Sequence, residues 1–508
     1  MWVVLTALLW LLVTALCWVG YTGEDDLFYA RYAYLFHRPP IVWWEFRMPA
    51  ILAIRGSFLV FGPTEFAAAF PSLVASLAIM ASVAWIVGWP RTLTWQSQSA
   101  MVLAALIPID VSFRSYPSAN QIAAGLMALG SVCMLKGGRR VPVIGAALLA
   151  LAFMTHEISF FYVALFCATL LAFDWRRFFR PVVWCVALSG ALAVAEAATY
   201  AVVLHDPLAR WKTSAATTTT VEIGSDPDVG IQGVRFFLWP IQNLIISKQF
   251  GIDLLVLLVA GTVAWRRLTR DHKALLVATF AVFLWFGYGS QVPWAYKPLY
   301  REYHYYNCLT LGIVALLPLA VGFALSHRPR LAQSIVGAAI AVHVLSLAAT
   351  GRWGANVKVS RELLQYAQSH PDQHFVTDVN TMNQMYTLNA FRLPDNIVCL
   401  NGEAVQRHLL LNKEPPDVPR FRFPERHVDA ALVNREQGNL RGFEREFSGF
   451  VQERGGDHTA VAQQRYRPAF VPLIRLLGPR GFMVQSAGGD VVAIAETRTP
   501  QVASVAGR

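Results

Sequence analysis

The sequence predicts an α-helical protein that crosses a membrane about eleven times and ends in a small α/β domain. Of its 508 residues, 55% are hydrophobic and 15% are charged, whereas soluble domains carry about 25% charged residues. The apolar residues come in blocks of about twenty, the length needed to cross about 30 Å of hydrocarbon. From residue 352 onward, charged residues, prolines and glycines replace these blocks.

The apolar blocks define the predicted helices in chain order. They lie at residues 2–20, 65–88, 97–112, 119–136, 141–155, 158–173, 182–204, 251–265, 274–290, 305–325 and 331–350. The first block lacks the basic start of a secretory signal, so it is expected to remain as the first helix.

The distribution of charge predicts the orientation. The gaps after the second, fourth, sixth, eighth and tenth helices are short and basic. They hold Arg91; Lys136, Arg139 and Arg140; Arg176, Arg177 and Arg180; Arg266, Arg267, Arg270 and Lys273; and Arg328 and Arg330. Lys and Arg gather in cytoplasmic loops, so the N-terminus is expected in the cytoplasm of a bacterial cell and the tail in the periplasm. The same distribution explains the net charge of +11 without nucleic-acid binding.

Two of the gaps on the periplasmic side are rich in apolar, aromatic and basic residues. Residues 40–62 and 230–250 are typical of helices that lie in the membrane interface beside the transmembrane region 1–350. The alternative is that either one is a further transmembrane helix.

The tail, residues 351–508, alternates between helical and strand patterns. Residues 357–369 and 380–391 predict helices, and the stretches HFVTD, NIVCL, VDAALV and DVVAIAET predict strands. This alternation indicates a small periplasmic α/β domain.

Six cysteines are too few for a disulfide framework in a chain of this length, and no Cys-x-x-Cys pair indicates a zinc or redox site.

Three consecutive acids, Glu24, Asp25 and Asp26, follow the first helix. Acids at the end of a membrane helix are unfavourable unless they are solvated, paired or used. The structural alternative is a hydrated cap for the next helix, which Asp favours. The topology places further polar residues on the same side of the membrane: Arg47, Arg114, His156, Glu157, Arg301 and His304.

The run Asp25-Asp26-Leu27-Phe28-Tyr29-Ala30 resembles the acidic motif of the GT-C glycosyltransferases. It is most similar to the branch with the protein O-mannosyltransferases and the aminoarabinose transferases of lipid A. Arg47-Met48-Pro49-Ala50 resembles the Lys-Pro-Pro segment of that branch, and Phe61-Gly62-Pro63-Thr64-Glu65 and Ala69-Phe70-Pro71-Ser72-Leu73 resemble the turn and helix start that follow. These motifs span the first ninety residues, and the helical architecture extends the resemblance to about residue 350.

The resemblance implies a sugar donor on a polyprenyl phosphate and an envelope glycolipid, a polysaccharide or a protein as acceptor. In such enzymes an aspartate takes the proton of the attacking hydroxyl, and the sugar is transferred with inversion. Asp25 corresponds to that base, and Asp26 or Glu24 would orient it. Arg47 and Arg301 are the candidates for the donor phosphate, because guanidinium groups suit phosphate contacts. The activity implied is that of a hexosyl- or pentosyltransferase.

Other residues are candidates for the substrate cavity. These are Glu24, Tyr29, Arg114, Asn120, His156, Glu157, Tyr303 and His304. Each has a structural alternative: Arg47 beside two tryptophans suits the lipid headgroups, the tyrosines near 303 suit an interfacial aromatic belt, and Arg114 or the His156-Glu157 pair could cap helices.

The sequence departs from the family pattern at two of these positions. Asn120 stands in a loop where many relatives have Asp, and His156 stands where relatives usually have Lys. Some members of the superfamily use a divalent metal, and the spacing of Asp25, Asp26, Glu157 and Glu302 does not demand one.

Two other classes of function stay open at this point. A transporter or lipid flippase would carry ionisable residues within broken or repeated helices, but the acids lie at the exported edge and Glu196 is the obvious intramembrane carboxylate. A non-catalytic envelope scaffold would tolerate replacement of Asp25 and Arg47.

Overall fold

The computed structural model describes most of the helical region and parts of the tail. The described residues are 2–22, 25–36, 39–40, 43–136, 140–213, 234–247, 249–290, 303–350, 355–377, 379–392, 395–399, 430–434, 457–464 and 492–498. The chain divides into two compact units. The first comprises residues 1–20, 42–60 and 66–351, and the second comprises residues 21–41, 61–65 and 352–508.

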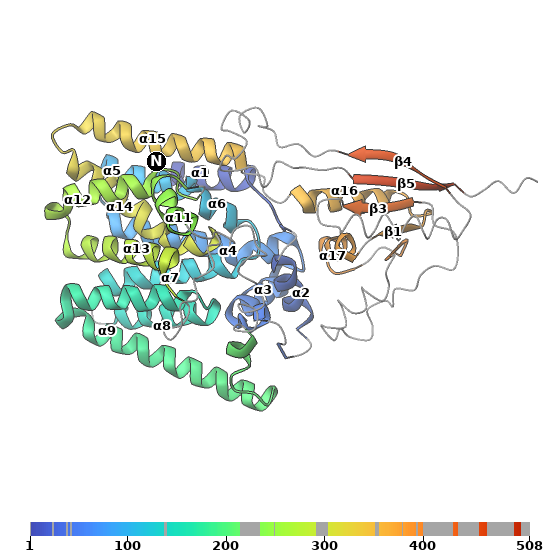
Figure 1. Ribbon diagram of the computed structural model, residues 1–508, viewed down its shortest axis with the longest axis horizontal. Helices are drawn as coiled ribbons and strands as arrows, with labels where there is room; N and C mark the ends of the chain where they lie inside the picture. Colours follow the sequence, from blue (N-terminus) through green and yellow to red (C-terminus); the bar gives the residue numbers. More distant parts are fainter. Residues whose placement is uncertain are drawn as a thin grey trace, which may run out of the picture. The chain divides into compact units, whose positions relative to one another are not determined.

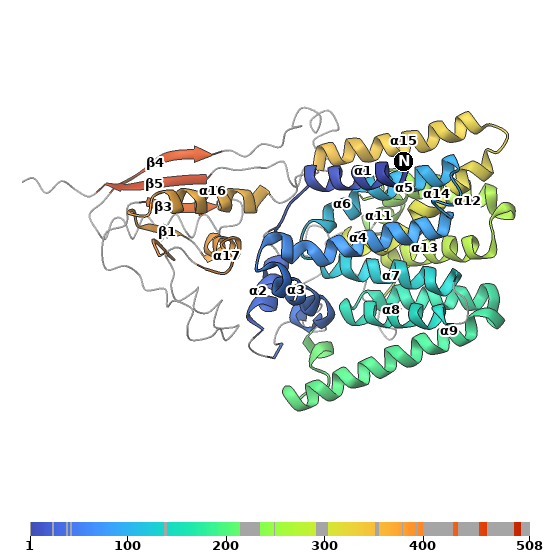
Figure 2. The same ribbon diagram turned by 180° about the vertical axis from the view of Figure 1, so that it is seen from behind.

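The first unit is built from helices (Figures 1 and 2). Its elements are α1 (Trp2–Leu16), η1 (Trp43–Phe46), α3 (Met48–Phe61), α4 (Glu65–Val87), α5 (Trp95–Leu106), α6 (Pro108–Arg114), α7 (Ala119–Lys136), α8 (Val141–Thr155), α9 (Ser159–Val203), α11 (Val234–Ile245), α12 (Asp253–Ala264), η2 (Trp265–Arg267), α13 (Arg270–Tyr288), η3 (Tyr303–Leu309), α14 (Thr310–Ala324) and α15 (Pro329–Thr350). Helices α7, α8 and α9 pack in sequence, while α14 packs against α5, α12 and α15.

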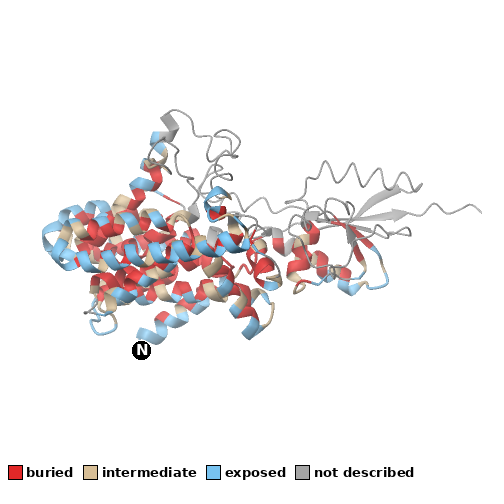
Figure 3. Ribbon diagram, turned by 90° about the horizontal axis from the view of Figure 1, so that it is seen from below, coloured by how far each residue is buried: buried red, intermediate tan, exposed pale blue. Residues whose placement is uncertain are grey.

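The outer surface of this unit is apolar, as expected for a protein surrounded by lipid. Buried residues concentrate between the helices and exposed ones face outward (Figure 3). The exposed residues include large apolar side chains such as Leu59, Val186, Val194 and Val202. Among the described residues, four helical stretches are long and apolar enough to cross a membrane: Glu65–Val87, Ser159–Val203, Tyr305–Ala324 and Pro329–Leu347. The chain is therefore a membrane protein.

The predicted helix 97–112 is two helices, α5 and α6, separated at Ile107. Ile107 has φ −60° and ψ 122°, which is extended backbone, and Pro108 occupies the first turn of α6. A proline disfavours helical geometry at the residue before it, so the break follows from Pro108. The apolar pattern continues through the break, which is why the pattern alone does not reveal it.

The predicted helices 158–173 and 182–204 are the two halves of α9, which is interrupted between them at Asp174. This residue has φ −158° and ψ 82°. Its carboxylate accepts a hydrogen bond from the backbone N–H of Arg177 at 3.1 Å, as an N-cap does for the helix that follows. The thiols of Cys167 and Cys185, from the two halves, contact each other. The halves of α9 therefore lie side by side.

The five basic gaps lie at one end of the helical unit. Contacts between residues in these gaps, or at the helix ends next to them, connect all five. The Arg177 guanidinium donates to the carbonyl of Leu135 at the end of α7 and to Asp271 at the start of α13, the latter at 2.7 Å. Arg267 donates to the carbonyl of Phe323, at the end of α14, at 2.8 Å. Gly322 lies against the side chain of Gln96, at the start of α5.

The two segments predicted to lie in the interface contain short helices. Helix α3 has 14 residues and α11 has 12, and at 1.5 Å per residue neither spans about 30 Å of hydrocarbon. On α11, Phe237, Leu238, Ile241 and Ile245 are exposed. An exposed apolar stripe on a short helix is typical of a helix in the interface plane.

The second unit combines α2 (Asp25–Leu35) with elements of the tail. These are α16 (Ala355–Ser369), β1 (Phe375–Thr377), α17 (Val379–Leu388), β2 (Ile397–Cys399), β3 (Ala430–Asn434), β4 (Asp457–Gln464) and β5 (Val492–Arg498). The strands form one sheet in the order β2-β1-β3-β5-β4. Strand β1 pairs parallel to β2 and β3, and β5 pairs antiparallel to β3 and β4. Strand β4 is absent from the sequence prediction.

Helix α2 is attached to the tail through an aromatic contact. The rings of Tyr34 and Phe391 stack with centroids 4.4 Å apart and an interplanar angle of 11°. Arg361 of α16 pairs with Glu65, just after the Phe61 turn. The second unit thus includes the helix that carries Asp25 and Asp26.

Candidate functional site

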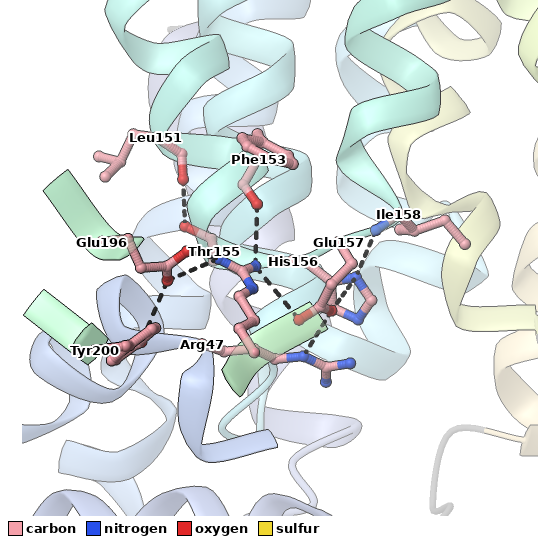
Figure 4. A network of polar contacts seen from close by, with 10 residues as sticks. Arg47, Leu151, Phe153, Thr155, His156, Glu157, Ile158, Glu196 and Tyr200 are labelled. Atoms are coloured by element: carbon pink, nitrogen blue, oxygen red, sulfur yellow. Dashed lines mark hydrogen bonds and ion pairs between the residues drawn. The ribbon is translucent and has the colours of Figure 1, made fainter. Parts of the chain in front are cut away.

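Four charged side chains form a continuous chain of ion pairs in the helical unit: Glu196, Arg210, Glu157 and Arg47 (Figure 4). We call these four residues the charge chain. Arg210 donates to both oxygens of Glu196, at 3.0 and 3.2 Å, and to Oε1 of Glu157 at 3.3 Å. The other oxygen of Glu157, Oε2, accepts from Nε of Arg47 at 3.3 Å. The signs of charge alternate along the chain, and its formal charges sum to zero.

The turn between α8 and α9 positions Glu157. Helix α8 ends at Thr155, and His156 is extended, with φ −153° and ψ 131°. Nδ1 of His156 accepts a hydrogen bond from the backbone N–H of Ile158 at 3.2 Å. His156 thus binds its own turn and lies 3.8 Å from Oε2 of Glu157, while Glu157 also reaches two arginines.

The charge of Glu157 is fixed by its neighbours. Burial opposes ionisation of the carboxyl, but the guanidinium groups of Arg47 and Arg210 outweigh that effect and hold its pKa at about 2. The side chain is 17% exposed, compared with 4% for Arg47 and 1% for Arg210. Glu157 is thus an anion at any physiological pH.

Arg210 is the functional candidate that the sequence analysis missed. It lies in the segment after α9, and its guanidinium also donates to the carbonyl of Phe153 at 3.3 Å and lies over the rings of Phe153 and Trp211. The available signal was Glu196, a carboxylate in an apolar helix, which required a cation nearby. That cation lies 14 residues further along the chain.

Arg47 begins the segment that leads into α3, and it is 3% exposed. The aromatic ring of Phe46, next to it, packs edge-on against Tyr200 of α9, with centroids 5.1 Å apart. This packing fixes the backbone beside Arg47. The terminal nitrogens of Arg47 point away from Glu157 (Figure 4).

Arg114 lies in a different environment from Arg47. It is fully buried, donates to Asp110 at 3.5 Å and to the carbonyl of Ala105 at 3.2 Å, and lies over the ring of Trp10. Asp110 also accepts hydrogen bonds from Ser76 and Gln121, each at 2.6 Å. Asp110 is therefore a second carboxylate within the apolar region, besides Glu196. These contacts join α1, α4, α6 and α7, and they favour a structural role for Arg114.

The acidic motif belongs to the second unit. Asp26 is 2% exposed, and both of its oxygens accept from Thr22: from the backbone N–H at 2.6 Å and from the hydroxyl at 2.7 Å. Burial, together with the charges of Glu65 and Asp26, raises the pKa of Tyr21 well above its usual value. Asp25 is the first residue of α2, and Tyr29, on the same helix, is buried.

The structure thus brings together Arg47, His156 and Glu157 in one unit, and it places Asp25, Asp26 and Tyr29 on one helix of the other. Asn120 is half-buried near the start of α7. Glu24 and Arg301 lie outside the described residues, and so do the side chains of Tyr303 and His304, whose backbone forms η3. Within the part of the chain that is described, no three His, Cys, Asp or Glu side chains come close enough to hold a metal ion.

Neither a protein-family model nor a curated protein matches the chain. Solved structures do. The crystal structure of ArnT from Cupriavidus metallidurans in the apo state matches with a TM-score of 0.52 and 14% identity, covering 97% of both chains. The structure of the same protein bound to undecaprenyl phosphate gives 0.48 and 13%, covering 100% and 99%, and the apo oligosaccharyltransferase of Archaeoglobus fulgidus gives 0.46 and 12%, covering 84% and 69%.

At this level of identity the likeness concerns the fold alone. ArnT is a member of the GT-C superfamily, and the apo structure covers nearly the whole of both chains. The similarity first indicated by the acidic motif therefore extends to the architecture: this membrane protein has a GT-C-like fold.

Proposed function

We propose that this chain is a glycosyltransferase that moves a sugar from a polyprenyl-phosphate carrier to an acceptor outside the cytoplasm. The observation that supports this most is the match to apo ArnT over 97% of both chains. The acidic motif at the end of the first helix and the cation Arg47 supply the two kinds of group that such a transfer needs. The acceptor would be an envelope glycolipid or a polysaccharide rather than a protein.

In this proposal Asp25 is the base. The acceptor hydroxyl attacks the anomeric carbon as its proton passes to the carboxylate, and the bond from that carbon to the phosphate oxygen breaks on the opposite face, with inversion. Asp26 is assigned a positioning role, because both of its oxygens already hold Thr22. That contact ties Thr22 to the first turn of α2, the turn that carries Asp25.

The departing phosphate needs positive charge close to it, because it gains negative charge as the bond breaks. Arg47 is the first candidate, with Arg301 as the second. The polyprenyl chain would lie in lipid beside α3 and α11, whose exposed apolar side chains suit the interface. The eleven crossings, the cytoplasmic N-terminus and the periplasmic tail, in a bacterial inner membrane, complete the proposal, and the tail would shape the acceptor side.

The test compares Asp25→Asn and Asp26→Asn with the wild-type chain in lipid nanodiscs, using a panel of polyprenyl-phosphate sugars and sugar release as the readout. Loss of a general base is expected to reduce turnover by about 10²- to 10⁴-fold, so Asp25→Asn should show that loss while donor binding persists. Asp206→Asn is the control, because Asp206 is at the surface and paired with Lys212 at 2.8 Å.

Turnover by both Asp25→Asn and Asp26→Asn at the wild-type rate would contradict the proposal. So would a wild-type chain that releases sugar from no lipid in the panel. In either case a transporter or an envelope scaffold becomes the better interpretation.

A further inference from the structure

The charge chain contains an anion where a phosphate-binding site would be expected to contain cations alone. Glu157 lies 3.3 Å from Nε of Arg47, the residue proposed to bind the donor phosphate. A carboxylate at that distance weakens the attraction of Arg47 for any anion. The presence of Glu157 therefore needs an explanation beyond the neutralisation of Arg47.

The donor and the product of the proposed transfer differ in charge. The donor is a phosphodiester with one negative charge. After the carbon–oxygen bond breaks, the carrier leaves as a phosphomonoester, whose second pKa is about 6 and whose charge at pH 7 is therefore close to −2. A site of pure positive charge would hold the product more tightly than the donor, and release of product limits many enzymes.

We propose that Glu157 is a positioning residue that sets the charge of the Arg47 site, so that the site favours the singly charged donor over the doubly charged product. The inference rests on the proposed function, because it takes Arg47 as the phosphate ligand. Each additional negative charge on the phosphate meets the repulsion of Glu157 as well as the attraction of Arg47. The product is penalised more than the donor.

Arg210 and Glu196 keep Glu157 in this role. Arg210 is buried and donates to Oε1 of Glu157, so the carboxylate cannot rotate away from Arg47 without losing that bond. The positive charge of Arg210 does not neutralise Glu157, because Arg210 is already paired with Glu196 through two hydrogen bonds, at 3.0 and 3.2 Å. One negative charge thus stays beside Arg47.

Stability alone does not account for this arrangement. Buried ion pairs often contribute little net stability, and apolar residues of the same size can replace them without loss. A chain of four charged groups at the end of a membrane helix is therefore better explained by control of charge at a site than by the strength of its contacts.

The experiment measures binding of two lipids to the full-length chain in nanodiscs: undecaprenyl phosphate, which carries close to two charges at pH 7.5, and its methyl phosphodiester, which carries one. The variants are Glu157→Gln, which removes the charge and keeps the shape, and Glu157→Asp, which keeps the charge. Glu196→Gln removes a charge at the far end of the charge chain, beyond Arg210, and tests how the effect falls with distance from Arg47.

Glu157→Gln is expected to bind undecaprenyl phosphate about tenfold more tightly, the size of change that one nearby charge produces in a partly hydrated site, and to bind the methyl diester less than about threefold more tightly. Product inhibition should strengthen in the same variant. Glu157→Asp should keep the wild-type ratio of the two affinities, and Glu196→Gln should change that ratio less than Glu157→Gln does.

An unchanged ratio of the two lipid affinities in Glu157→Gln would overturn the inference. So would an equal loss of affinity for both lipids, which is the pattern of a purely structural residue. Failure of the proposed function looks different: the wild-type chain itself would bind neither lipid and release no sugar.

Discussion

The carboxylate of Glu157 lies 3.3 Å from Nε of Arg47, although 110 residues separate the two in the chain. One belongs to the turn between α8 and α9, and the other precedes α3. The contact ties an expected interface segment to the helical unit at the point where two predicted site residues meet. Because Arg47 lowers the pKa of Glu157, the effect of the contact can be measured by changing the pH.

The first prediction concerns acid. The pKa of Glu157 is about 2, below the ordinary 4.5, so folding favours the ionised form. The stabilisation is complete above pH 4.5 and is lost as the pH falls from 4.5 to 2. The change corresponds to about 3 kcal/mol. Thermal unfolding in detergent should therefore show Glu157→Gln less stable than wild type at pH 7, with the difference shrinking below pH 4.5. A difference that is constant down to pH 3 would show that Glu157 is not held ionised by its arginines.

The second prediction concerns Arg210. Replacement by Met leaves Glu157 and Glu196 without their shared cation, and the loss of one partner of a buried pair destabilises by about 3–5 kcal/mol. Thermal unfolding of Arg210→Met should show this loss. Lys212→Met is the control two residues away: its ion pair with Asp206 is exposed, so its loss should be below about 1 kcal/mol. Equal effects of the two replacements would mean that Arg210 does not hold the carboxylates.

The third prediction separates Arg114 from Arg47. Arg114→Met should destabilise strongly, because Asp110 keeps a buried charge, and Arg114→Met combined with Asp110→Leu should recover part of the loss. Folded Arg114→Met protein should bind undecaprenyl phosphate as the wild type does, whereas Arg47→Met should lose binding by about tenfold or more. Lipid binding that falls in Arg114→Met would place Arg114 in the donor site instead.

The fourth prediction tests the reversal within α9. Because the thiols of Cys167 and Cys185 contact each other, mild oxidation with copper phenanthroline should link them within one chain, which peptide mass spectrometry detects. Cys167→Ser should abolish the product. Links to other cysteines in place of this one would indicate that the two halves of α9 do not lie side by side.

The sequence predicts the helical region well because the bilayer imposes a simple requirement. An apolar block of sufficient length forms a helix, since lipid offers no partners for an open backbone. The error arises where a single residue alters the backbone inside an apolar run, because Pro108 ends α5 early. Asp174 interrupts α9 between the predicted helices 158–173 and 182–204, which are its two halves. Strand β4, with the sequence DHTAVAQQ, lacks the apolar alternation that identifies strands.

The candidate site could be predicted only in part. The acidic motif and Arg47 follow from the resemblance to a known family, and His156 and Glu157 from the predicted side of the membrane. The partners could not be predicted, because no periodicity links Glu157 to residues 110 positions before it and 53 after it. The sequence around Arg210 does not distinguish it from other loop residues, and its role follows only from its contacts with Glu196 and Glu157.

Helix α2 is attached to the tail through the stacked rings of Tyr34 and Phe391. Helix α2 and a segment more than 350 residues later therefore belong to one compact unit. A chain truncated after the last membrane helix would leave α2 without this partner. Loss of activity in such a truncation would report on the support of the acidic motif as much as on acceptor binding. A Tyr34→Ala variant of the intact chain would distinguish the two effects.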